Sequence, residues 1–258
     1  MADAADRPTP IRASALEGVT HGFFGREGGV STGEVAGLQI GQGAGDDPAA
    51  VAENRARVTA ALSPGAVLVL PYQVHSADAA IVTAPMADED RPHVDAFVTA
   101  TPGLLIGVVT ADCAPILLAD AQAGVVAAAH AGWRGAKGGV LATTIDAMVA
   151  LGADCGRIAA AIGPTIAQPS YEVGEAFFEA FCADDPANVR FFTSGKPGHY
   201  QFDLPAFVTR QLRNAGVSTI ENLALDTYAD PVRFYSFRRA THRGEATYGR
   251  QGAFIGLD

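Results

Sequence analysis

Apolar runs separated by glycine, proline and polar residues divide the chain into short strands and a few helices. Near-continuous apolar stretches at 94–100, 103–113 and 156–164 predict buried strands, because strands covered on both faces lack apolar–polar alternation. A fourth run, 66–76, contains Pro71, and we expect the chain to leave the sheet at that residue. Two further apolar segments, 114–120 and 124–130, predict a β-hairpin.

Helical segments alternate with these strands. Asp47 before Pro48 is typical of a helix N-terminus. The helices are predicted over 47–62, 138–152, 171–183 and 204–216. The ends of the chain are expected to hold a polar lead-in with a short strand over 1–18, and a strand, an arginine-rich loop and a strand over 234–257. This order predicts an α/β (α+β) fold with a mixed sheet, in a single domain over 1–258.

Composition narrows the class of protein. The 258 residues are 48% hydrophobic and 18% charged, which is typical of a globular domain, and the net charge of -10 argues against a nucleic-acid partner. Three cysteines form no disulfide framework and favour a reducing compartment. The N-terminus lacks a secretory pattern, and no apolar run reaches the ~20 residues of a membrane span. We expect a cytoplasmic protein without a membrane partner; its oligomeric state stays open.

The hairpin carries a cysteine and a histidine at its two ends. A turn centred on Ala121 and Gln122 would pair Ala119 with Gly124, and the same register would place Cys113 opposite His130. Cross-strand partners have Cβ atoms ~4.5–5.5 Å apart. A thiolate and an imidazole at that separation can share a metal ion or form a nucleophile–base pair. The glycine-rich segment after the histidine, "AGWRGAKGG", predicts a turn into a helix, whose free N–H groups suit an anion.

A catalytic zinc site needs a third protein ligand. His75 is favoured because it follows the proline break at the end of a strand, but spacing alone leaves His21 and His93 open. The alternative is a metal-free cysteine hydrolase or amidase, with Cys113 as nucleophile and His130 as base. That enzyme would need no third ligand.

Arginines gather near the C-terminus of this acidic chain. Five of them fall within 18 residues, which predicts an anion site, because guanidinium groups match phosphate geometry. They are Arg233, Arg238, Arg239, Arg243 and Arg250. Arg26 and Arg134 have glycine neighbours and are further candidates for phosphate or ribose contacts.

Several motifs together resemble the bacterial laccase-domain family, which has been called polyphenol oxidase, purine nucleoside phosphorylase and peptidoglycan editing factor. They are "HGFFGREGGVS", "QVHS", "TADCAPILLAD", "HAGWRG", "IGPTIAQPSYEVG" and "FYSFRR…GRQ", and they cover nearly the whole chain in order. The chain departs from the family at Gly25, Thr165 and Ser170, and its loop "RRATHRGEATYGR" is longer than usual.

The resemblance implies a metal site and a chemistry. Its ligands would be His75, Cys113 and His130, its metal zinc, and its fold layered sheets with helices. It also implies phosphorolysis of adenosine, inosine, guanosine and methylthioadenosine, adenosine deamination, or action on peptidoglycan precursors. The partners would then be a small purine nucleoside and phosphate. Copper is less favoured, because multicopper centres use roughly ten histidines and this chain has six.

Roles for the remaining candidate residues follow from this expectation. Cys113 and Asp112 are predicted to be catalytic, the aspartate as a proton shuttle beside the metal ligand. The predicted substrate-binding residues are Arg26, Gln73, Arg134, Arg238 and Arg250.

Overall fold

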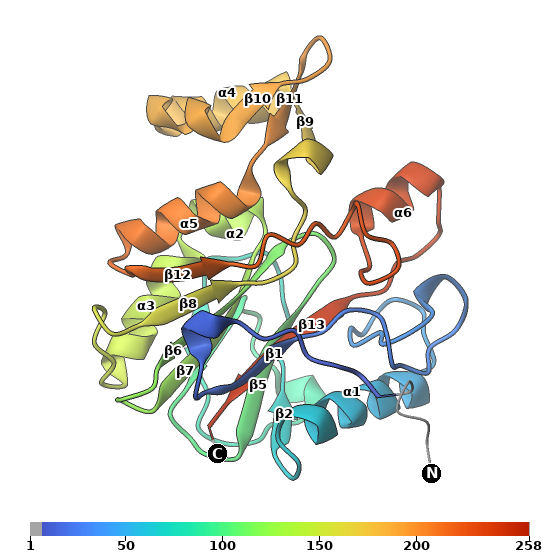
Figure 1. The fold of residues 1–258 in the computed structure, drawn as a ribbon, viewed down its shortest axis with the longest axis vertical. Coiled ribbons are helices and arrows are strands. Elements are labelled where there is room, and N and C mark those ends of the chain that lie inside the picture. Colours follow the sequence, from blue (N-terminus) through green and yellow to red (C-terminus); the bar gives the residue numbers. More distant parts are fainter. Residues whose placement is uncertain (1–6, 258) are drawn as a thin grey trace.

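Three β-sheets organise the protein in a computed structural model that describes residues 7–257 (Figure 1). A four-stranded sheet has the order β1 (Thr20–Phe23), β13 (Gln251–Gly256), β5 (Leu104–Thr110), β2 (Val67–Val69). A six-stranded sheet has the order β12 (Thr219–Asn222), β8 (Ala159–Ile162), β6 (Ala114–Asp120), β7 (Val125–Ala131), β4 (Ala96–Thr99), β3 (Ala79–Ile81). A small sheet contains β10 (Phe192–Ser194), β11 (His199–Phe202) and β9 (Glu172–Gly174).

The helices connect and cover these sheets. They are α1 (Pro48–Leu62), α2 (Trp133–Gly138), α3 (Val140–Ala150), α4 (Glu175–Asp184), α5 (Leu204–Asn214) and α6 (Phe237–Arg243). Short 3-10 turns lie at Ser14–Leu16, Gly33–Val35, Asp88–Asp90, Gln168–Ser170 and Pro186–Phe191. Parallel pairs β2–β5, β3–β4 and β8–β12 occur beside antiparallel ones, so the predicted mixed-sheet α+β fold is confirmed.

Side-chain alternation along the central strands stacks the two large sheets. In β5, Ile106 and Val108 face the six-stranded sheet, and Leu105 faces the other way. Leu117 on β6 and Ala128 on β7 meet them from the opposite sheet. Strand side chains point alternately to the two faces, which explains why a continuous apolar run serves two cores at once.

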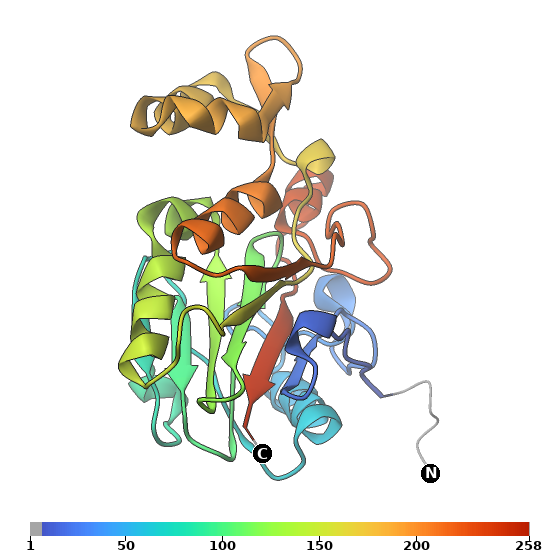
Figure 2. The same cartoon turned by 60° about the vertical axis from the view of Figure 1, so that its left-hand side comes forward.

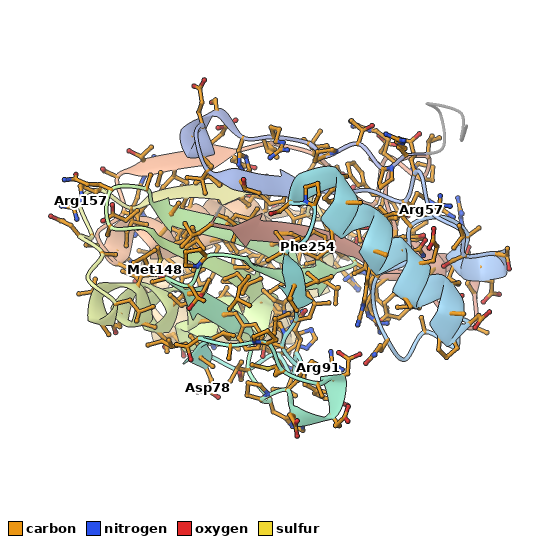
Figure 3. The ribbon with its side chains drawn as sticks, turned by 90° about the horizontal axis from the view of Figure 1, so that it is seen from below. Arg57, Asp78, Arg91, Met148, Arg157 and Phe254 are labelled. Carbon is orange, nitrogen blue, oxygen red and sulfur yellow. The ribbon has the colours of Figure 1, made fainter. Side chains whose placement is uncertain are left out.

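Helices close the two outer faces of this stack, which Figure 2 shows with α1 and α3 on opposite sides. Val58 and Leu62 of α1 pack with Phe254 of β13, labelled next to α1 in Figure 3. Helices α3 and α5 cover the outer face of the six-stranded sheet. The small sheet and α4 project beyond this stack, and their phenylalanines form an aromatic cluster at its margin (Figure 1).

The predicted hairpin exists, but its predicted register is wrong by two residues. Asp120 pairs with Val125 and Pro115 pairs with His130, so the loop has four residues rather than two. The Asp120 carboxylate accepts hydrogen bonds from the N–H groups of Gln122 and Ala123 at 3.1 Å each, which stabilises the longer turn. Because the shift is even, His130 still points to the face that the prediction gave it.

Several segments differ from the predicted secondary structure. Residues 172–174 of the helix predicted over 171–183 form β9 instead, and α4 begins only at Glu175. The strand and arginine-rich loop expected after Phe234 are replaced by α6, which Ser236 caps by accepting from the N–H of Arg239 and which Gly244 ends in a left-handed conformation. The glycine-rich turn after the hairpin is already helical from Trp133. Of the predicted lead-in, residues 1–6 lie outside the described residues, and the rest forms a bridge at Ile11 and a 3-10 turn.

Candidate metal centre and its cavity

Three segments bring His75, Cys113 and His130 together. His75 lies in the loop after β2, Cys113 in the turn between β5 and β6, and His130 on β7. Their ligand atoms all lie within 4.8 Å of one another, and Cys113 Sγ is 3.9 Å from His75 Nε2. Within residues 7–257, no other group of three histidine, cysteine, aspartate or glutamate residues meets this criterion. The arrangement could hold one metal ion.

The buried carboxylate of Asp95 fixes two of the three side chains. It accepts hydrogen bonds from the backbone N–H groups of Val74 (3.2 Å), His75 (3.0 Å) and Ser76 (2.6 Å) and from the Ser76 hydroxyl (3.0 Å). It also bonds His130 Nδ1 at 2.7 Å. A histidine held by a carboxylate on one ring nitrogen presents the other nitrogen to a metal. Asp95 therefore leaves Nε2 of His130 for a ligand.

The backbone near the group is shaped for close approach. A Cβ atom on Gly132 would lie 2.9 Å from Cys113 Sγ and 3.0 Å from His75 Cδ2, so a side chain at this position would push the ligands apart. His75 and Asp112 both adopt positive φ angles, 61° and 87°, which side-chain-bearing residues rarely do. Such strained backbone next to reactive side chains is typical of functional sites.

Electrostatics favour a thiolate beside an imidazolium in the metal-free site. Burial alone would raise the pKa of Cys113, but His130 and His75 lower it to about 7. Burial alone would lower the pKa of His130, but Cys113 and Asp95 raise it to about 9. Asp95 has a pKa lowered to about 2, because its hydrogen bonds with His130 and Ser76 outweigh the effect of burial. A metal cation in place of the imidazolium proton would likewise keep the sulfur as a thiolate.

The candidate metal group lies in the wall of a cavity of about 570 Å³. Two arginines, Arg91 and Arg250, line the same cavity. Arg91 pairs with Asp88 at 3.3 Å and donates to Gln42 Oε1 at 2.6 Å, whereas Arg250 has no carboxylate partner among the described residues. Arg250 donates to Tyr248 Oη at 3.1 Å, and its side chain occupies the space that Gly41 leaves without a Cβ. Metal ligands and cations in one cavity of this size suit a small anionic substrate.

The predicted binding residues divide into two sets. Gln73 and Arg250 line the cavity; the Gln73 amide group is paired with the backbone of Val109 in both directions at 2.8 Å. Arg26 is engaged elsewhere, because it donates to the carbonyls of Ala36 and Pro231. Arg134 is exposed, with its guanidinium over the ring of its neighbour Trp133. The structure does not bring Arg26 or Arg134 into the cavity wall.

Asp112, predicted to be catalytic, and Arg238 of α6, predicted to bind substrate, are not among the residues that line the cavity. The Asp112 carboxylate accepts hydrogen bonds from Thr227 Oγ1 (2.6 Å), Ser236 Oγ (2.9 Å) and the N–H of Arg238 (2.7 Å). Burial raises its pKa. The Arg238 guanidinium donates to the carbonyl of Glu172 at 2.7 Å. Their contacts hold the turn that carries Cys113 against α6.

The other histidines that spacing left open are not ligands of this group. His21 accepts from the N–H of Ala13 at 2.9 Å and bonds the carbonyl of Val19 through its other nitrogen. His93 stacks on Tyr72 with ring centroids 4.4 Å apart.

Some cavity residues escaped sequence analysis. Arg91 is a single arginine between an acidic turn and Pro92, and nothing in its sequence neighbourhood indicates a site. Figure 3 shows it on the side of the molecule where α1 lies. Phe237 and Tyr248 also line the cavity; Phe237 directly precedes the segment predicted to be a loop, and Tyr248 lies within it. The serine cap and terminal glycine of α6 are signals in the sequence that place Phe237 at the start of a helix.

Comparisons with known proteins show the family and the fold of the chain. The sequence model of the family described as "Multi-copper polyphenol oxidoreductase laccase" matches residues 20–258. A protein from Deinococcus radiodurans named purine nucleoside phosphorylase is 43% identical over 249 residues, covering 96% of this chain and 92% of that protein. One of the same name from Mycobacterium tuberculosis H37Rv is 40% identical over 234 residues, covering 90% of each.

Solved structures show the same fold. YlmD from Geobacillus stearothermophilus superposes with a TM-score of 0.87 at 31% identity, covering 99% of this chain and 97% of that one. A Neisseria meningitidis protein of the family DUF152 gives 0.85 at 35% identity, covering 98% and 99%. Over the described residues, none of the helices has the length and apolar character to cross a membrane.

Proposed function

This chain belongs to the multi-copper polyphenol oxidoreductase laccase family, and on that premise we propose that it is a metal-dependent purine nucleoside phosphorylase. The observation that carries the proposal is one cavity that joins the His75–Cys113–His130 group to Arg91 and Arg250. Phosphorolysis needs an anion site for phosphate beside the nucleoside. The relatives that are named purine nucleoside phosphorylase support the same choice.

We propose zinc as the metal. Two imidazoles and one thiolate are donors that zinc prefers, and three protein ligands leave a fourth position open. The donor set fits. Asp95 bonds Nδ1 of His130 and so leaves Nε2 for the metal, and Gly132, which has no side chain, leaves room beside the sulfur of Cys113. When bound, zinc would supply a Lewis acid that polarises a substrate atom, without redox chemistry.

The proposed reaction exchanges one bond for another at the ribose. A phosphate oxygen forms a bond to C1′ while the C1′–N9 bond breaks, and its electron pair leaves with the purine, which takes up a proton. Arg91 and Arg250 would hold the phosphate, because guanidinium groups bind its oxygens in pairs. Adenosine, inosine, guanosine and methylthioadenosine are the proposed substrates. The proton-shuttle role predicted for Asp112 belongs to deamination and stays a prediction; Asp112 is not among the residues that line the cavity.

Adenosine deamination is the less favoured activity of the same pocket. Zinc deaminases use a carboxylate beside the metal as general acid and base. Over the part of the chain that the structure describes, the residues lining this cavity include no aspartate or glutamate. Phosphorolysis depends instead on cations, which the cavity contains.

Two other chemistries are also less favoured. A cysteine hydrolase, including one that acts on peptidoglycan precursors, would need only Cys113 and His130, and the third donor His75 beside the sulfur is then unexplained. A multicopper oxidase needs several clustered metal ions, and the described residues provide one group with two histidines. Adventitious copper can cause slow phenol oxidation, so only oxidation that persists after a chelator has removed loosely bound copper would favour the oxidase.

The proposal is tested by incubating zinc-loaded protein with inosine and phosphate. We expect hypoxanthine release that requires phosphate, stops after metal chelation and returns with zinc. Arg250→Gln should raise KM for phosphate about 10- to 100-fold, because a hydrogen bond to a charged group is lost. Arg243→Gln is the control and should leave KM unchanged, since Arg243 is exposed and pairs with Glu245. Zinc-loaded protein without turnover, or hypoxanthine release without phosphate, would contradict the proposal.

A further inference from the structure

Two half-exposed aromatic side chains line the cavity and are not explained by metal or phosphate binding. They are Tyr72, which is 51% exposed, and Phe237, which is 50% exposed. A single exposed aromatic residue on a protein surface needs no explanation. Two exposed aromatic residues that line the same cavity as a candidate metal group do need an explanation. Flat apolar walls with a few polar groups are typical of small-molecule sites.

Each of these rings is held in place by a second ring. Tyr72 lies parallel to His93, with centroids 4.4 Å apart and planes at 18°, and its N–H donates to the carbonyl of Pro92 at 3.1 Å. Phe237 meets Tyr248 edge to face, with centroids 5.0 Å apart at 61°. Rings fixed by such contacts lose little rotational freedom when a ligand binds, which favours their use as binding surfaces.

The aromatic residues Tyr72 and Phe237 are connected to the arginines of the same cavity. Tyr248, which supports Phe237, also lines the cavity and accepts a hydrogen bond from Arg250. On the other side of the cavity, the N–H group of Tyr72 donates to the carbonyl of Pro92, the residue next to Arg91. A ligand with a planar apolar group and an adjacent anion therefore meets both kinds of surface.

Resting on the proposed function, we propose that Tyr72 and Phe237 bind the nucleoside by stacking on its planar base. Every nucleobase has a π-face, so stacking tolerates different exocyclic groups. A bicyclic purine offers more area than a pyrimidine and is therefore preferred. The two rings act on nucleoside binding and leave phosphate binding to the arginines.

The test compares Tyr72→Ala and Phe237→Ala with wild-type protein. Base–aromatic stacking corresponds to a loss of about 5- to 150-fold in affinity on alanine substitution. We expect each variant to raise KM for inosine and for adenosine about 10-fold, by the same factor for both, with KM for phosphate unchanged. Calorimetric binding of free hypoxanthine should weaken by a similar factor. Tyr72→Phe, which keeps the ring, should restore both values to within about twofold.

Controls separate this role from a structural one. Val232→Ala removes an apolar side chain that is 71% exposed and outside the cavity wall, and should change none of these values. Tyr72→Leu keeps apolar bulk without the π-face, and should behave like the alanine variant. Unchanged hypoxanthine affinity in both alanine variants, an equal loss in phosphate KM, or recovery by leucine would overturn the inference. If wild-type protein binds hypoxanthine through these rings but cleaves no nucleoside, the phosphorylase proposal fails and the stacking inference stands.

Discussion

Replacing Asp95 by asparagine should damage both the stability of the protein and its affinity for metal. The carboxylate accepts five hydrogen bonds and has a pKa of about 2, against an ordinary value of 3.8. This lowering of the pKa corresponds to about 2 kcal/mol of unfolding free energy at neutral pH. Asparagine keeps the shape, but its NH₂ group would face hydrogen-bond donors. We therefore expect metal-free Asp95→Asn to lose about 2–4 kcal/mol.

The effect on metal binding has a separate origin. Without the carboxylate, the His130 ring is no longer held with Nε2 toward the site, and the loop of His75 loses its anchor. Loss of such a supporting group typically lowers metal affinity 10- to 100-fold. Competition with a chromophoric zinc chelator measures this affinity, and guanidinium unfolding of the metal-free protein measures the stability.

Asp120→Asn is the matched control. Asp120 is also a buried carboxylate with a pKa lowered to about 2; burial opposes this, and hydrogen bonds from Arg157, Asp154 and Ala123 outweigh it. It lies at the far end of the same hairpin, so its substitution should cost similar stability and leave zinc affinity unchanged. If Asp95→Asn is destabilised like the control but binds zinc with wild-type affinity, Asp95 does not orient the ligands and the reasoning is refuted.

Three further predictions concern the thiol, the glycine and the hairpin turn. In metal-free protein, alkylation of Cys113 by iodoacetamide should rise with a midpoint near pH 7, because the neighbouring histidines lower its pKa; a midpoint above pH 8 would contradict this, and bound zinc should protect the thiol. Gly132→Ala should weaken zinc binding at least 10-fold, because its Cβ would lie 2.9 Å from the sulfur, whereas Gly174→Ala, with no atom within 4 Å, should bind zinc normally; equal affinities would exclude the steric role. The stability that Asp120 contributes is present above about pH 4, since its folded pKa is depressed, and should be lost as pH falls from 4 to 2. Acid unfolding of Asp120→Asn should therefore show a shallower slope in this range, and an unchanged slope would refute the assignment.

The central strands β2 and β4 to β8, the last strand β13 and the long helices could be predicted because local pattern and burial agree in them; the short strands β1, β3 and β9 to β12 were not predicted. The helix over 47–62 has its Asp47 cap and terminal break in the sequence, and β5 has an uninterrupted apolar run. The hairpin register could not be predicted from the same pattern. It depends on the Asp120 side chain binding two turn N–H groups, a contact that selects a four-residue loop over a two-residue one.

The metal group could be placed from sequence only with help from family resemblance. The spacing of the hairpin predicts that Cys113 and His130 lie close together. His75, however, lies 38 residues before Cys113 in the sequence, and Asp95, which accepts a hydrogen bond from its N–H group, belongs to no recognisable motif. The arginine cluster shows the opposite limit. Arg239 donates to buried backbone carbonyls and Arg243 pairs with Glu245, so density of charge in sequence did not mean convergence in space.

Two of the three candidate ligands lie where the chain crosses between sheets. His75 stands between β2 and β3, and Cys113 between β5 and β6, and each of these pairs has one strand in either large sheet. An ion bound there would cross-link the two sheets and oppose their movement relative to each other. Metal binding would then make local opening between the sheets rarer, and amide hydrogen exchange in β5 and β6 would slow together when the metal binds.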